Sequence, residues 1–172
     1  MKQELSKRLQ FMVAIPVLVA LIIIGLPLAG CVYVLWWLYG MTIHVLVWGC
    51  WCMRGIHVIV VYSDSPVWHD YIDEKMIPRL PENTIILNWS ERRTWQWYPL
   101  RVQVFHYFGG KRHFNPLVLV FHPLRRTGTF RFWQAFRDYK HGNSQPLHEM
   151  EQRMFKAVAK TGNTLPGKRS RP

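Results

Sequence analysis

Charge is missing from a long stretch near the N-terminus: no Asp, Glu, Lys or Arg occurs from Phe11 to Met53. One helical crossing of a bilayer takes about 20 apolar residues, so this stretch is roughly twice as long as a single perpendicular crossing needs. Residues 1–10 form a basic N-terminus that contains Lys2, Lys7 and Arg8. The pattern predicts a membrane segment over residues 11–53.

Cysteine is absent from the rest of the chain, because Cys31, Cys50 and Cys52 all lie inside the uncharged stretch. A domain that follows Met53 can therefore use neither disulfides nor thiolate metal ligands. One residue separates Cys50 from Cys52, whereas about two to four usually separate paired zinc ligands. Glycine-rich phosphate loops, paired catalytic carboxylates and clustered metal ligands are also missing. The sequence predicts no catalytic residue, no metal and no cofactor.

The segment Gly25-Leu-Pro-Leu-Ala-Gly30 suits a tight reversal, because glycine permits positive φ and proline interrupts helical hydrogen bonding. We therefore expect a helical hairpin, with apolar helices at about 11–29 and 32–53 and a turn near 25–30. Two crossings return the following domain to the side of the basic N-terminus, which the positive-inside rule keeps in the cytoplasm. We expect a bacterial inner membrane with the soluble domain cytoplasmic. A single crossing would place that domain outside.

A second interpretation concerns Cys31. The sequence Leu28-Ala-Gly-Cys31, after a basic start and an apolar stretch, resembles a bacterial lipoprotein signal, whose cysteine becomes the lipidated first residue. The residues after Cys31 stay apolar, which favours retention of the whole stretch in the membrane.

Residues 54–160 predict one soluble α/β domain. Short apolar runs predict buried strands at 57–63, 84–89 and 116–122. Apolar residues at helical spacing, with caps and glycine stops, predict helices at about 66–80, 98–108 and 144–160. The first strand, helix and second strand predict a parallel pair. Residues 129–133 fit either a fourth strand or a helix, and residues 161–172 predict a disordered basic tail.

Two prolines lie at informative positions in this order of elements. Ser65-Pro66 begins the helix after the first strand, and Asn115-Pro116 precedes the third strand. The βαβαββα order with these prolines resembles the thioredoxin-like superfamily, in which Cys-x-x-Cys begins the first helix and a cis-proline faces it. Asp64-Ser-Pro-Val67 occupies the Cys-x-x-Cys positions here. The resemblance implies a small sandwich with a binding groove and, since both cysteines are absent, no thiol-disulfide exchange. Another small α/β sandwich is the alternative.

The loops after the first two strands are expected to meet at the carboxyl edge of the sheet, where open α/β folds bind ligands. The candidate residues of this binding edge are Ser63, Asp64, Ser65, Trp68, Ser90, Arg92 and Arg93, with Asn115 and Pro116 beside them. Free helix amides and two arginines could receive a phosphate or carboxylate. Asp64 would repel such an anion, so a capped helix beside a solvated loop is the alternative.

Basic residues outnumber acidic ones, giving a net charge of +12, and from Arg92 onward there are sixteen basic residues and three acidic ones. Aromatic residues alternate with arginines in two places, which predicts a basic-aromatic face of Trp95, Trp97, Arg131, Trp133 and Arg137. Such a face suits an acidic protein or anionic lipid. Single-stranded nucleic acid is a less favoured partner.

These features predict a membrane-anchored, non-redox, thioredoxin-like module that binds or scaffolds an acidic protein or anionic lipid. Two alternatives stay open. One is an enzyme that acts on a phosphate-bearing or membrane-associated substrate at the binding edge. The other is a structural subunit of a membrane complex.

Overall fold

The computed structural model describes residues 2–110, 115–123 and 125–162. From residue 163 onward the predicted basic tail lies outside the described residues. The chain divides into two compact units, residues 1–42 and residues 43–172. The second unit is a mixed α/β domain, which confirms the predicted fold class at that level.

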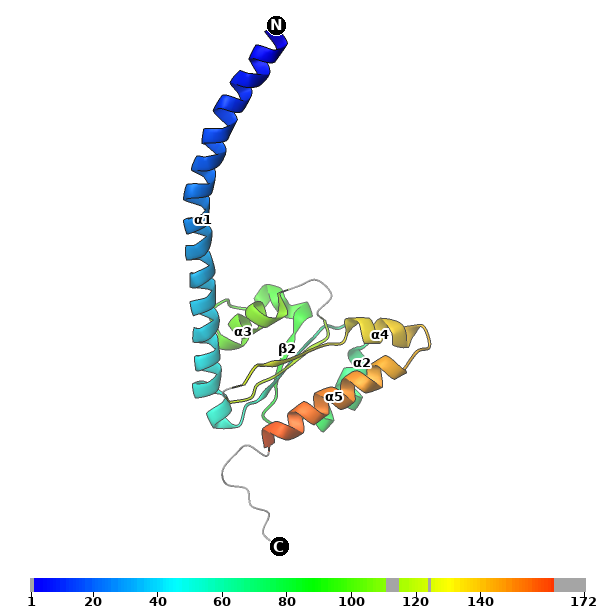
Figure 1. Cartoon of the computed structure of the whole chain (residues 1–172). Coiled ribbons are helices and arrows are strands. Elements are labelled where there is room, and N and C mark those ends of the chain that lie inside the picture. Colours follow the sequence, from blue (N-terminus) through cyan, green and yellow to red (C-terminus); the bar gives the residue numbers. More distant parts are fainter. Residues whose placement is uncertain (1, 111–114, 124, 163–172) are drawn as a thin grey trace. The chain divides into compact units, whose positions relative to one another are not determined.

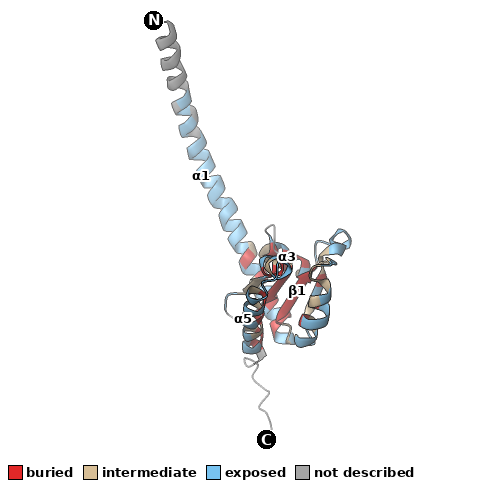
Figure 2. Ribbon diagram, turned by 90° about the vertical axis from the view of Figure 1, so that its right-hand side faces the viewer, coloured by how far each residue is buried: buried red, intermediate tan, exposed pale blue. Residues whose placement is uncertain are grey.

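One continuous helix, α1 (Lys2–Cys50), contains both Pro16 and Pro27 (Figure 1). The predicted hairpin with a turn near residues 25–30 is therefore wrong. A turn in so apolar a segment would leave backbone carbonyls and amides without polar partners, whereas a helix satisfies them within the segment. All side chains from Leu21 to Leu38 are exposed (Figure 2).

Within the described residues, Leu21–Arg54 is long and apolar enough to cross a membrane, by length and composition. A membrane anchor and a signal sequence share this property.

The sheet of the second unit has the strand order β2-β1-β3-β4. Its strands are β1 (Val58–Tyr62), β2 (Ile85–Asn88), β3 (Leu117–Val120) and β4 (Gly128–Arg131). β1 and β2 are parallel, as the sequence predicted, and β3 is antiparallel to both β1 and β4. The sheet is therefore mixed, with β2 and β4 at its two ends.

The segment after β1 is helical but irregular. It comprises α2 (His69–Tyr71), the π-helical η2 (Ile72–Met76) and the 3-10 helix η3 (Ile77–Arg79), where a single helix over 66–80 was expected. Pro78 lies in the last piece and has no amide hydrogen to continue an α-helical ladder. The segment nevertheless buries Ile72 and Met76 completely, so it still covers the sheet.

The remaining helices include one that the sequence did not separate. Residues 129–133 fitted either a strand or a helix, and both are present. The strand β4 ends at Arg131, and the helix α4 (Trp133–Lys140) begins two residues later. α3 (Leu100–Gly109) and α5 (Gln145–Gly162) lie close to their predicted positions. The 3-10 helix η1 (Cys52–Arg54) lies where the predicted apolar helix 32–53 ends, and the 3-10 helix η4 (Trp89–Thr94) begins at the last residue of the predicted strand 84–89.

Helices cover both faces of the sheet. One face presents Val58, Val60 and Tyr62 of β1, which join a buried cluster with residues of η2, α4 and α5, among them Met76, Phe136 and Met154. Strand residues alternate between faces, so Ile59 and Val61 belong to the opposite face, together with Phe121. The α3 residue Phe108 contacts Phe121 on that side, with ring centres 5.9 Å apart.

The second unit also contains the end of α1. Ile43, Val47 and Trp51 are buried, and the Trp51 ring lies 6.0 Å from Phe121. His44 contacts Phe108 at 5.4 Å between ring centres. The compact domain therefore begins about ten residues before the charge pattern indicated, because the last turns of this apolar helix serve as part of its core.

Candidate functional site

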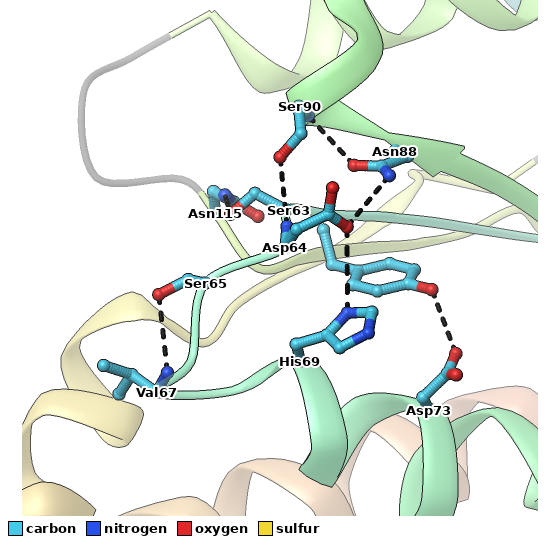
Figure 3. A network of polar contacts seen from close by, with 10 residues as sticks. Ser63, Asp64, Ser65, Val67, His69, Asp73, Asn88, Ser90 and Asn115 are labelled. Atoms are coloured by element: carbon cyan, nitrogen blue, oxygen red, sulfur yellow. Dashed lines mark hydrogen bonds and ion pairs between the residues drawn. The ribbon is translucent and has the colours of Figure 1, made fainter.

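Polar residues meet where β1 and β2 end (Figure 3). The Asp64 amide donates to Ser90 Oγ over 3.0 Å, and Asn88 Nδ2 donates to Asp64 Oδ1 over 3.0 Å. Asn88 Oδ1 in turn accepts the Ser90 amide at 2.9 Å, which caps η4. Parallel strands bring their carboxyl ends to one edge, so the two loops reach each other. Asp64, Asn88 and Ser90 thus form a closed ring of hydrogen bonds.

The loop before β3 joins the same edge. Asn115 Nδ2 donates to Ser63 Oγ over 2.7 Å, and the Asn115-Pro116 peptide bond is cis. Ser65 Oγ accepts the Val67 amide at 3.5 Å. The structure therefore brings together the predicted edge residues Ser63, Asp64, Ser65, Ser90, Asn115 and Pro116 around three loops. Trp68, which was also predicted to belong to this edge, packs against the core instead, with its ring centre 6.2 Å from that of Phe136.

A second group of side chains lies below the ring of hydrogen bonds. The Tyr62 and His69 rings stack 5.8 Å apart, and Tyr62 Oη donates to Asp73 Oδ1 over 3.0 Å. His69 Nδ1 lies 3.8 Å from Asp64 Oδ1, an ion-pair distance for protonated imidazole and too long for a hydrogen bond. The sequence did not single out Tyr62, because its pairing with Asp73 depends on the rotational phase of the following helix.

The pKa of Tyr62 is raised to about 12. Burial is the largest cause, followed by the hydrogen bond to Asp73 and the negative charges of Asp73, Asp64 and Glu91. Each of these carboxylates disfavours a phenolate beside it. Tyr62 therefore stays a neutral hydrogen-bond donor at physiological pH.

The two arginines of the predicted edge do not complete an anion site. Arg92 lies over the Trp89 ring, 4.9 Å from its centre, and donates through Nη1 to the Trp89 carbonyl over 3.2 Å. Arg93 is exposed. The helix that follows Ser65 has only one α-helical turn, so its start offers few aligned amides. The loop of the predicted alternative is solvated at Asp64 and Pro66, but no described side chain caps the helix that begins at His69.

The predicted basic-aromatic face is not one surface. Trp95 packs on Phe105 of α3 at 5.6 Å between ring centres, and Arg131 donates to the Phe108 carbonyl of the same helix. Trp133 and Arg137 belong to α4, where the guanidinium lies 5.1 Å from the ring centre. Since α3 and α4 cover opposite faces of the sheet, these residues separate. Trp97 is 76% exposed and stands apart in the connection before α3.

A cleft of about 360 Å³ lies along β2. Its lining residues come from β2, η4, the connection after η4 and the start of α3: Ile86, Leu87, Asn88, Glu91, Thr94, Trp95, Gln96, Pro99, Arg101 and Val102. The sequence did not indicate this cleft, because it depends on how the connection between β2 and α3 folds back. Among the described residues, no group of three or more His, Cys, Asp or Glu side chains is placed to hold a metal ion.

The chain matches no protein-family model, no curated protein and no solved structure. Its function is therefore argued from the geometry and charge of its own residues.

Proposed function

We propose that the protein is a membrane-anchored, non-redox binding module of thioredoxin-like architecture whose partner is acidic. The strand order β2-β1-β3-β4, with one parallel and two antiparallel pairs, supports the architecture. Asp64 and Pro116 stand at the positions that the resemblance assigns to Cys-x-x-Cys and to the cis-proline. A carboxylate and three hydroxyl groups at that edge cannot exchange disulfides.

The hydrogen bonds at the binding edge favour a binding module over an enzyme. A hydrolytic serine needs a base that takes its proton. Ser63 and Ser90 accept hydrogen bonds from Asn115 Nδ2 and from the Asp64 amide, and among the described residues no imidazole or carboxylate accepts a hydrogen bond from either hydroxyl. His69 lies next to Asp64, and Arg92 is held by Trp89. Ser63, Asp64, Asn88 and Ser90 are thus engaged in hydrogen bonds within the edge, whereas the buried atoms Asn115 Oδ1 and His69 Nδ1 have no hydrogen-bond partner in the part of the chain that the structure describes.

The charge of the chain supports an acidic partner. The net charge is +12, and the segment that begins at Arg92 contains most of the excess. A field of this sign raises the rate at which anionic partners meet the domain. Arg93, Arg101 and Arg137 are exposed and lie on elements of the compact unit.

The binding test uses the full chain in micelles of a non-ionic detergent, so that α1 stays covered. Fluorescence anisotropy of labelled poly-glutamate is followed as the protein is added, with labelled poly-lysine of equal length as the matched control. We expect saturable binding of poly-glutamate that weakens as salt is raised, because screening reduces attraction between charges. Absence of poly-glutamate binding at low salt, or equal binding of both polymers, would refute the proposed function.

We further propose that α1 crosses the membrane once and places the domain opposite the N-terminus. The cytoplasmic placement expected from the sequence depended on two crossings. Three basic residues precede the apolar stretch, whereas Arg54 is the only basic residue among the first twenty that follow it. The positive-inside rule then retains the N-terminus in the cytoplasm. A phosphatase or fluorescent-protein reporter after Pro172 tests this, and cytoplasmic reporter activity would contradict it.

A further inference from the structure

One edge of the sheet is open to another strand. β2 pairs with β1 on one side and stands at the end of the described sheet on the other. Alternate backbone amides and carbonyls of such a strand point away from the sheet and are free to pair with an added chain. Natural edge strands are commonly protected by a charge or a proline. The sequence of β2, Ile85-Ile-Leu-Asn88, has neither.

The cleft described above runs along this edge. We call it the edge groove and define it by Ile86, Trp95, Pro99, Arg101 and Val102, with the β2 backbone on one side. Ile86 is 44% exposed although its neighbour Leu87 is buried. An exposed apolar residue beside unpaired backbone groups is the combination that strand addition uses, since the backbone gives affinity and side-chain contacts give specificity.

Charge decides between the possible occupants of the edge groove. Glu91 and Arg101 both line it, so their charges cancel locally, while the exposed Arg93 follows Glu91 in the chain by two residues. A second copy of the protein would bring a net charge of +12 against the same charge. Like charges placed together oppose association. The surrounding field therefore favours an acidic segment over a second copy.

We propose that the edge groove binds an extended acidic peptide, which adds to β2 as a further strand of the sheet. This inference rests on the proposed function and gives it a location. The peptide backbone would pair with the free groups of β2. Its acidic side chains would meet Arg101 and Arg93, and its apolar side chains would contact Ile86.

The test measures anisotropy of a labelled peptide of alternating glutamate and valine, added to the full chain in non-ionic detergent. A control peptide of the same sequence carries N-methyl groups on alternate amides, which removes backbone donors and leaves charge unchanged. Arg101→Glu reverses a charge at the groove. Lys156→Glu makes the same change at an exposed position on α5 and serves as the matched control.

We expect the methylated peptide and the R101E chain each to show binding weakened by about tenfold or more, and K156E to stay within about threefold of the wild type. Equal binding of the two peptides, or equal loss in R101E and K156E, would overturn the edge groove while leaving poly-glutamate binding intact. Far-ultraviolet circular dichroism of R101E verifies that it is folded.

Two further outcomes decide against the proposal. A chain that sediments as a dimer and releases the peptide as protein concentration rises would show that a second copy occupies the edge. Vesicles that contain phosphatidylserine and bind wild type and R101E alike, when the peptide binds neither, would make anionic lipid the partner. If the wild-type chain bound neither the peptide nor poly-glutamate, the proposed function itself would be refuted.

Discussion

Replacement of Tyr62 by phenylalanine tests the geometry of the candidate site. The substitution removes one oxygen from a buried residue, and this oxygen donates to Asp73 over 3.0 Å in a partly buried hydrogen bond. Asp73 is exposed, so water can replace the lost donor. The cost at neutral pH is therefore that of one hydrogen bond, about 1 kcal/mol of the free energy of unfolding. Tyr98→Phe, at a ring that is 64% exposed, removes the same atom and is expected to leave stability unchanged.

The pH dependence gives the larger effect. An unfolded chain releases a tyrosine proton at about pH 10, whereas folded Tyr62 has a pKa of about 12. The folded state thus holds the proton more tightly between these values, and stability falls as pH rises through this range. The full difference corresponds to about 2–3 kcal/mol, present below about pH 10 and lost as pH passes the folded pKa. Tyr62→Phe lacks this component, so its stability falls less steeply in the same range.

Two assays on the full chain in detergent measure these quantities. Denaturant unfolding followed by circular dichroism gives the free energy at neutral and alkaline pH for both chains. The ultraviolet absorbance of tyrosinate, measured as the difference between wild type and Tyr62→Phe, gives the pKa directly. If the difference titrates at about pH 10, the ordinary tyrosine value, then Tyr62 is neither buried nor hydrogen-bonded to Asp73, and the described site is wrong.

Further predictions concern the core and an ion pair in which only the carboxylate is buried. Phe136→Ala empties a fully buried site between α4 and the sheet, and is expected to lower the free energy of unfolding by about 3–5 kcal/mol. Tyr139→Ala on the same helix, at an exposed ring, is expected to cost under about 1 kcal/mol in the same denaturant titration. Arg79 Nη1 lies 4.0 Å from Glu151 Oε2, and Glu151 is buried whereas Arg79 is exposed. Arg79→Ala leaves a buried carboxylate without its cation and is expected to destabilise more than Glu151→Met, because water can solvate the remaining Arg79; the reverse order in thermal unfolding would contradict this pairing.

The sequence predicted the domain core well, because strand formation depends on local composition. The apolar runs around Val60 and Val118 became the two central strands, and the spacing between β1 and β2 correctly indicated a parallel pair. The hairpin failed for a physical reason. Glycine and proline favour a turn in water, where freed backbone groups are solvated, but the segment at 25–30 offers no polar partner for them.

The positions of site residues that follow the strands could be predicted from the sequence. The positions of residues on helices could not, because they depend on which side of the sheet each helix covers. Ser63, Asp64 and Ser90 follow parallel strands, so their meeting could be expected. Trp95 and Trp133 both lie close to arginines in the sequence. The sheet nevertheless separates them, because Trp95 contacts α3 and Trp133 belongs to α4. The edge groove was not predictable, since it requires the fold of the connection between β2 and α3.

Hydrogen exchange at β2 tests the central claim that the domain binds an acidic segment. Exchange of backbone amides in the full chain in detergent is followed by mass spectrometry, with and without the alternating glutamate-valine peptide. The account predicts that the peptide slows exchange within residues 85–88, because added strand bonds protect the outward amides. Slowing confined to residues 63–68, or no change anywhere at saturating peptide, would contradict it.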